Sequence, residues 1–171
     1  MSTFFIALAE IVLGFLIAIV VIYFSFKSFR KFLSVELSEV YHNSALAILM
    51  ATFIFASGFI LQDVIRPTFM TAEIISESNP PLVMLIIKTL AYLFMYVIIC
   101  LALGLLIVLS AFKMFDLLTK GVDEHDEIVI KGNIPVAITV AAIIIIITLL
   151  LNPSIELLIE TLIPKPDLFI N

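Results

Sequence analysis

The chain contains 171 residues, of which 63% are hydrophobic and 13% are charged, whereas a soluble domain averages about 45–50% apolar and about 25% charged residues. This composition excludes a disordered chain and nearly excludes a water-soluble globule, because too few polar side chains are available to cover its surface. A formal net charge of −5 argues against nucleic acid as a partner, and a single cysteine, Cys100, excludes a disulfide scaffold.

Four apolar stretches follow one another along the chain, and each is long enough to cross a bilayer as a helix, which takes about 20 residues. They are expected at residues 4–26, 44–62, 82–112 and 134–151. The predicted fold class is therefore all-α, a polytopic membrane protein with four transmembrane helices. The third stretch is longer than a membrane requires, so its first residues are expected to project outward or to lie in the interface.

Prolines predict where these helices begin and end. The pair Pro80-Pro81 sets the start of the third stretch, and Pro67 is expected to stop the second helix. The segment from there to residue 79 is then expected to form a short interfacial helix. Asn152-Pro153-Ser154 is expected to break the chain after the fourth stretch. A short amphipathic helix is expected next, at residues 155–163, on the outer leaflet or against a partner.

The positively charged residues are distributed unevenly among the connections. Six of the nine lie after the first and third spans, and they are Lys27, Arg30, Lys31, Lys113, Lys120 and Lys131. The positive-inside rule therefore predicts that these two connections are cytoplasmic and that both termini are extracytoplasmic. No Lys or Arg precedes the first span and no small-x-small site follows it, so we expect an uncleaved anchor rather than a signal peptide.

The two halves of the chain resemble each other when one is shifted by 90 residues. Asn43 then falls on Asn133, and Gly14 falls on Gly104. The sequence therefore predicts two tandem helical hairpins of the same orientation, at residues 1–62 and 82–151. The connector at residues 63–81 and the amphipathic tail at residues 152–171 are both expected outside the cytoplasm.

Small residues recur on one face of the last helix of each hairpin. The first set is Ala47, Ala51 and Gly58, and the second set is Ala137, Ala141 and Thr148. The spacing i, i+4, i+11 places each set on a single helix face. Small residues allow close approach of helix backbones in lipid, so each set predicts a packing seam.

The pattern of Leu118-Thr119, Gly121, Glu127-Ile128 and Lys131-Gly132-Asn133, leading into a last span with small residues, resembles the YjfL-like family. These are small bacterial inner-membrane proteins grouped under a domain of unknown function. The resemblance covers residues 1–151 and implies tandem two-span repeats with four spans in the cell inner membrane. It implies no established activity and supplies no catalytic residue. The chain departs from the family pattern at Pro135, near the start of the fourth helix.

Glu10 lies about six residues into the first span, where a carboxylate costs a few kcal/mol unless it is paired or reaches water. Lys88 is expected in the same half of the bilayer. One hypothesis pairs Glu10 with Lys88, within one chain or between subunits. The alternative is that Glu10 reaches the outer headgroups or is protonated.

Polar residues elsewhere are expected to serve structure more than chemistry. Asn43 and Asn133 are good helix N-caps, with a pore-lining ring of amides as the alternative. The acidic run Asp123-Glu124-His125-Asp126-Glu127 is interpreted as a solvated turn rather than a cation site. Asp63 and Arg66 are three residues apart and are expected to form an exposed ion pair.

No nucleotide-binding, metalloprotease, serine-hydrolase or Cys-x-x-Cys motif occurs, so we expect no enzyme, no cofactor and no metal. The expected protein is a non-enzymatic membrane component, embedded in the lipid bilayer, that forms homo-oligomers or joins a larger membrane complex. The alternative function is a small oligomeric ion channel or ion-coupled transporter that uses Glu10. Charge-dependent flux abolished by Glu10→Gln would favour this alternative.

Overall fold

The computed structural model describes residues 3–119 and 126–165, without the side chains of residues 3–7, 9, 10 and 37. All regular elements in these two ranges are helical. They are α1 (Thr3–Leu33), α2 (Leu37–His42), α3 (Ser44–Leu61), η1 (Gln62–Val64), α4 (Ile65–Glu77), α5 (Leu82–Thr119), η2 (Asp126–Ile130) and α6 (Ile134–Thr161). Four helical stretches are long and apolar enough to cross a membrane, which confirms the all-α fold class with four spans.

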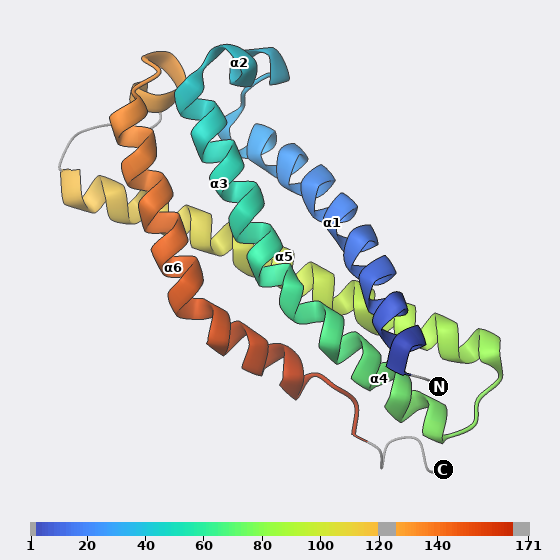
Figure 1. Cartoon of the computed structure of the whole chain (residues 1–171). Helices are drawn as coiled ribbons and strands as arrows, with labels where there is room; N and C mark the ends of the chain where they lie inside the picture. Colours follow the sequence, from blue (N-terminus) through green and yellow to red (C-terminus); the bar gives the residue numbers. More distant parts are fainter. Residues whose placement is uncertain (1–2, 120–125, 166–171) are drawn as a thin grey trace.

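The helices pack around α3, which has α1, α5 and α6 as neighbours (Figure 1). α3 makes its most extensive contact with α6, the second helix of the predicted second repeat. α2 and η2 lie together at one end of the bundle, which we call the capped end. α4, the start of α5 and the end of α6 lie at the opposite end, and α5 crosses the other helices obliquely.

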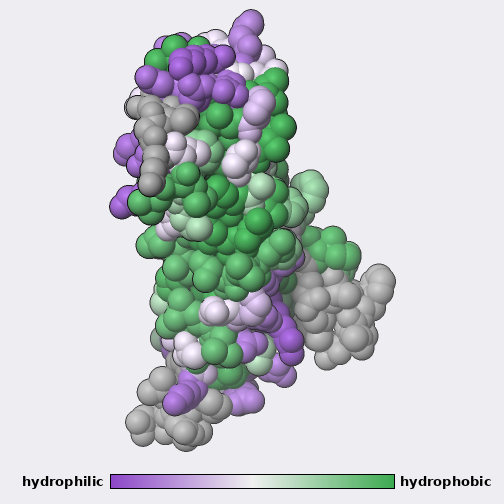
Figure 2. Space-filling model, turned by 90° about the vertical axis from the view of Figure 1, so that its left-hand side faces the viewer, coloured by the Kyte–Doolittle hydropathy of each residue, from purple (hydrophilic) through white to green (hydrophobic). Residues whose placement is uncertain are grey.

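The surface of the bundle is apolar where lipid would surround it. Figure 2 shows a broad hydrophobic zone between two ends that carry the hydrophilic side chains. α1 and α5 supply many of the exposed apolar side chains, including Phe15, Ile19, Leu90 and Phe94. A surface of this kind is unfavourable in water and is the expected one in hydrocarbon.

The sequence predicted that the second span ends at Pro67, and the structure shows that it does not. α3 ends at Leu61 and continues through the 3-10 turn η1 into α4, where Pro67 is the third residue. A proline is tolerated in a first turn because its missing N–H has no partner there. The tighter 3-10 turn starts a new first turn without separating the two helices. The expected interfacial helix is therefore the continuation of α3.

The fourth span does not break at Asn152-Pro153-Ser154. α6 continues through Pro153 to Thr161 and changes direction in its second half (Figure 1). Proline inside a helix removes one hydrogen bond and bends the axis, and membrane helices tolerate this when neighbours hold the chain. Ile155 and Ile159 are buried beyond the proline, whereas Glu156 and Glu160 are exposed. The predicted amphipathic segment exists, and it is part of α6.

The remaining helix boundaries follow local signals. α5 begins directly after Pro80-Pro81, as predicted. Its 38 residues make it about 57 Å long, which is more than a bilayer core requires. α1 ends at Leu33, where Ser34 adopts a φ of 54° and Val35 N–H donates to the Arg30 carbonyl at 3.2 Å. A left-handed residue of this kind is a common helix stop.

The interior is filled by two apolar clusters. The cluster toward the capped end joins Leu49, Phe53 and Phe112 to Ala137 and Ile144. The cluster toward the opposite end consists of Ile17, Val21, Ile60, Leu61, Val64, Tyr96, Val97, Cys100, Ile107, Ile155 and Ile159. Within the second cluster, the buried hydroxyl groups of Thr71 and Tyr96 share a hydrogen bond of 2.8 Å. The helices are therefore held by side-chain packing, with polar bonds at a few interior points.

Candidate functional site

The two small-residue seams occupy different environments. Ala137, Ala141 and Thr148 on α6 are all buried, and the Thr148 hydroxyl donates to the Ile144 carbonyl at 2.8 Å. On α3, by contrast, Ala47 and Ala51 are exposed and Gly58 is partly exposed. The seam of the second repeat packs within the bundle, and that of the first repeat faces outward. We call the outward set, Ala47, Ala51 and Gly58, the open seam.

The glycines show the same difference. A methyl group added to Gly104 would lie 3.7 Å from Ile60 Cδ1, and one added to Gly14 would lie 3.5 Å from Ile65 Cδ1. Both positions therefore face the continuous segment α3–η1–α4, which we call the α3–α4 arm, at ordinary van der Waals distance. A methyl group on Gly58 would meet no atom within 4 Å of the described residues. Glycine weakens a helix by about 0.5–1 kcal/mol relative to alanine. At Gly58 no close contact within the described chain compensates for this cost.

Gly58 lies in a shallow groove between α1 and the α3–α4 arm. Gly14 and Ala18 of α1 line the same groove, with Ile54 and Ile65 on the other side. The groove walls are almost entirely apolar, and its small residues come from two helices. A surface of this shape can receive the ridge of another transmembrane helix.

Asn43 joins the two repeats at the capped end. Its side-chain oxygen accepts from the backbone N–H groups of Ala45 and Leu46, at 3.0 and 3.2 Å, and so caps α3 as predicted. Its amide nitrogen donates to the carbonyls of Ile128 and Val129 in η2, at 2.8 and 3.2 Å. The one side chain therefore caps a helix of the first repeat and holds the loop of the second.

Gly132 makes the close approach at Asn43 possible. Its φ of +64° is a left-handed conformation that favours glycine, and an added methyl group would lie 3.5 Å from Asn43 Oδ1. The chain then enters α6 at Asn133. The sequence pattern Lys131-Gly132-Asn133 marked this turn, but it did not indicate that Asn43 would reach across to it.

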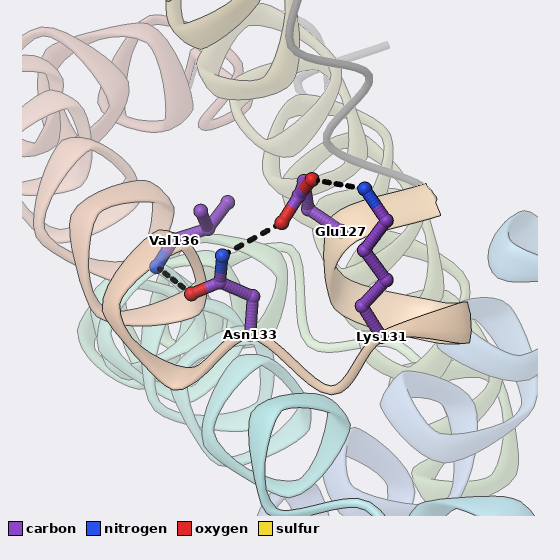
Figure 3. A network of polar contacts seen from close by, with 4 residues as sticks. All are labelled: Glu127, Lys131, Asn133 and Val136. Carbon is purple, nitrogen blue, oxygen red and sulfur yellow. Dashed lines mark hydrogen bonds and ion pairs between the residues drawn. The ribbon is translucent and has the colours of Figure 1, made fainter.

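Asn133 caps α6 within its own repeat (Figure 3). Its oxygen accepts from Val136 N–H at 3.4 Å, and its nitrogen donates to Glu127 Oε2 at 2.7 Å. Glu127 Oε1 in turn accepts from Lys131 Nζ at 2.6 Å. Both asparagines are therefore caps, as predicted, and in both the amide nitrogen fixes η2.

The ion pair beside Asn133 shifts the pKa values of both of its members, Glu127 and Lys131. Hydrogen bonds from Lys131 and Asn133 lower the pKa of Glu127 below its usual range. The Glu127 hydrogen bond raises the pKa of Lys131. The pair lies at the exposed end of the molecule, so its contribution is local and modest.

The structure places the other candidate residues as follows. Lys88 is half-buried in α5, and Glu10 lies in α1 with its side chain outside the described residues, so their pairing stays a prediction. Asp123, Glu124 and His125 also lie outside the described ranges. Asp126 and Glu127 form the start of η2.

The expected ion pair between Asp63 and Arg66 does not form. Asp63 lies instead beside Asn152 and Glu156 of α6, which sequence spacing could not indicate.

Comparison with known proteins gives one match. A family model described as Domain of Unknown Function (DUF350) matches residues 2–155, which include the first three spans, most of α6 and both seams. Searches of curated proteins and of solved structures returned no match.

Proposed function

The chain belongs to the DUF350 family, and we propose that it is a non-enzymatic, self-associating subunit of the cell inner membrane. A second copy of the chain covers the open seam. The observation that carries this proposal is Gly58: it lies in an apolar groove, and nothing within 4 Å in the described chain requires a glycine there. A helix from another copy would gain the close contact that glycine permits.

The unequal burial of the spans supports the same proposal. In the most apolar 18-residue stretch of α1, 17% of the residues are buried inside the molecule. In the corresponding stretch of the α3–α4 span, 56% of the residues are buried. Gly58 of the open seam and several residues of α1 line one groove, so a partner helix there would contact both helices. Ala47 and Ala51 extend the contact toward the capped end, because they share one face of α3 with Gly58.

The membrane orientation in this proposal follows the basic residues. The capped end carries the Lys-rich connections and faces the cytoplasm, and both termini are extracytoplasmic. In that orientation the Asn43–η2 contact fixes the cytoplasmic ends of both hairpins. The role we propose for the assembly is that of a scaffold or complex subunit within the membrane.

The test measures association in lipid vesicles by energy transfer between donor- and acceptor-labelled copies. Gly58→Leu fills the groove and is expected to weaken self-association about tenfold or more, which corresponds to about 1.4 kcal/mol. Ala142→Leu is the matched control, since Ala142 is an exposed small residue on α6, outside the groove. Equal association of wild type and Gly58→Leu would contradict the proposal.

A small oligomeric ion channel or ion-coupled transporter is the second candidate, because Glu10 and Lys88 place charge within apolar spans. Flux across reconstituted vesicles that is lost in Glu10→Gln would support it. Stoichiometric association with no flux would support the scaffold.

A further inference from the structure

A 3-10 turn and a proline-containing helix meet at Asp63. The residue lies on η1, where the regular helical bonding of the second span changes to a 3-10 turn. η1 packs against α5 and against α6. The α6 residue beside Asp63 is Asn152, which directly precedes Pro153. A 3-10 stretch inside a long helix often marks a functional position or local strain.

Two buried oxygen atoms lie at this junction without a donor. Asp63 Oδ2 and Asn152 Oδ1 are each inaccessible to solvent, and neither has a hydrogen-bond partner among the described residues. The Asn152 side chain is in hydrogen-bonding contact with Asp63, yet these two oxygens remain without a donor. Both are acceptors only when the carboxyl group is ionised. Buried polar atoms are rarely left in this state, and each exception calls for an explanation such as a bound water or ion or a functional role.

We propose that Asp63 is a proton-binding site, in which the protonated carboxyl donates from Oδ2 to Asn152 Oδ1. The proton comes from a hydronium ion: one of its O–H bonds breaks as an O–H bond forms at Oδ2, a water molecule is left, and the carboxylate charge is neutralised. The reverse step returns the proton to water. A single proton thus satisfies both buried oxygens at once. This site does not depend on self-association through the open seam.

The surroundings of Asp63 act in both directions: the Asn152 hydrogen bond favours the ionised carboxylate, whereas the acidic neighbour and burial favour the neutral form. Glu156, one turn further along α6, is the nearby acidic group. Cys100 faces Asp63 from α5 and is buried. Arg66, on the same arm as Asp63, is exposed and makes no ion pair with it. A negative neighbour favours the neutral form of a carboxyl group, and burial among apolar side chains does the same.

The experiment is infrared difference spectroscopy of the full chain in lipid nanodiscs during a pH titration. The wild type is expected to show the carbonyl band of a protonated carboxyl that disappears as the pH rises. Asp63→Asn is expected to abolish that band while retaining the fold, because the amide has the same shape and can donate to Asn152 Oδ1. Asn152→Leu removes the acceptor and is expected to shift the band, and Glu156→Gln is the control that keeps it.

Three results would overturn the proposal. The band could survive unchanged in Asp63→Asn, which would assign it to another carboxyl group. Asp63 could stay ionised over the whole titration, held in that form by the Asn152 hydrogen bond. Addition of sodium ions rather than a change in pH could remove the Asp63 signal, which would identify a metal cation as the ligand.

Discussion

The two predicted repeats carry matching sets of small residues, and only the set on α6 is buried within the bundle. Ala137, Ala141 and Thr148 are buried in the bundle, whereas Ala47 and Ala51 are exposed. The difference arises because α3 packs against α5 of the other repeat as well as α1 and α6, and these neighbours use other faces of α3. A duplicated sequence therefore need not produce duplicated contacts. The copy that remains outside is the one available to a second molecule.

The largest expected effect separates the buried seam from the open seam. Ala137→Leu inserts a larger side chain into a fully buried position and is expected to destabilise the monomer by about 1–3 kcal/mol. Ala47→Leu is its equivalent in the first repeat and is expected to change monomer stability by less than about 0.5 kcal/mol. Unfolding of both variants in detergent, under conditions where the protein is monomeric, measures the difference. Equal destabilisation would show that the seams are packed alike.

The next effect compares the two caps. Asn43→Ala removes two accepted and two donated hydrogen bonds and is expected to cost about 2 kcal/mol. Asn133→Ala removes one long cap bond and one bond to an exposed pair, and is expected to cost about 1 kcal/mol or less. The same unfolding measurement ranks them. A larger cost for Asn133→Ala would remove Asn43 from its proposed role as the link between the repeats.

A smaller effect is expected at Gly132. Gly132→Ala forces a side chain into a left-handed backbone and is expected to cost about 1 kcal/mol. The residue at the equivalent position of the first repeat is His42, in α2, where replacement by alanine is expected to be nearly neutral. Hydrogen exchange of the η2 amides would report the loosening in Gly132→Ala. Unchanged exchange would mean that this turn does not depend on glycine.

The smallest effect is a pH dependence confined to the second repeat. Glu127 has a lowered pKa, so its stabilising contact is present above the ordinary glutamate range and is lost as the pH falls through the lowered value. Lys131 has a raised pKa, so its contribution is lost as the pH rises through the raised value. Hydrogen exchange in η2 is therefore expected to accelerate at both extremes. Glu127→Gln is expected to abolish the acid response, and an unchanged response in that variant would assign it elsewhere.

Sequence patterns predicted the features that depend on local chemistry. Apolar run length located the four spans, the proline pair located the start of α5, and asparagine chemistry identified both caps. The prolines at 67 and 153 were misinterpreted as helix ends, because tertiary packing of residues such as Ile155 and Ile159 outweighs one missing hydrogen bond.

Contacts between segments far apart in the chain could not be predicted from the sequence. The donation from Asn43 to η2 joins residues more than 80 positions apart, and the meeting of Asp63 with Asn152 depends on how η1 packs against α6. The sequence also predicted the two seams as equivalent. Which of them becomes buried depends on how the other helices pack around α3, which no periodicity encodes.

Cysteine cross-linking in the membrane tests the open seam most directly. Ala51→Cys places a thiol in the middle of the seam, and Ala142→Cys places one on the exposed surface of α6; the native Cys100 is only 1% exposed and serves as an unreactive background. We predict that a short bifunctional reagent links two copies of the Ala51→Cys protein and leaves the Ala142→Cys protein monomeric. Efficient linkage of Ala142→Cys with none at Ala51→Cys would contradict the account.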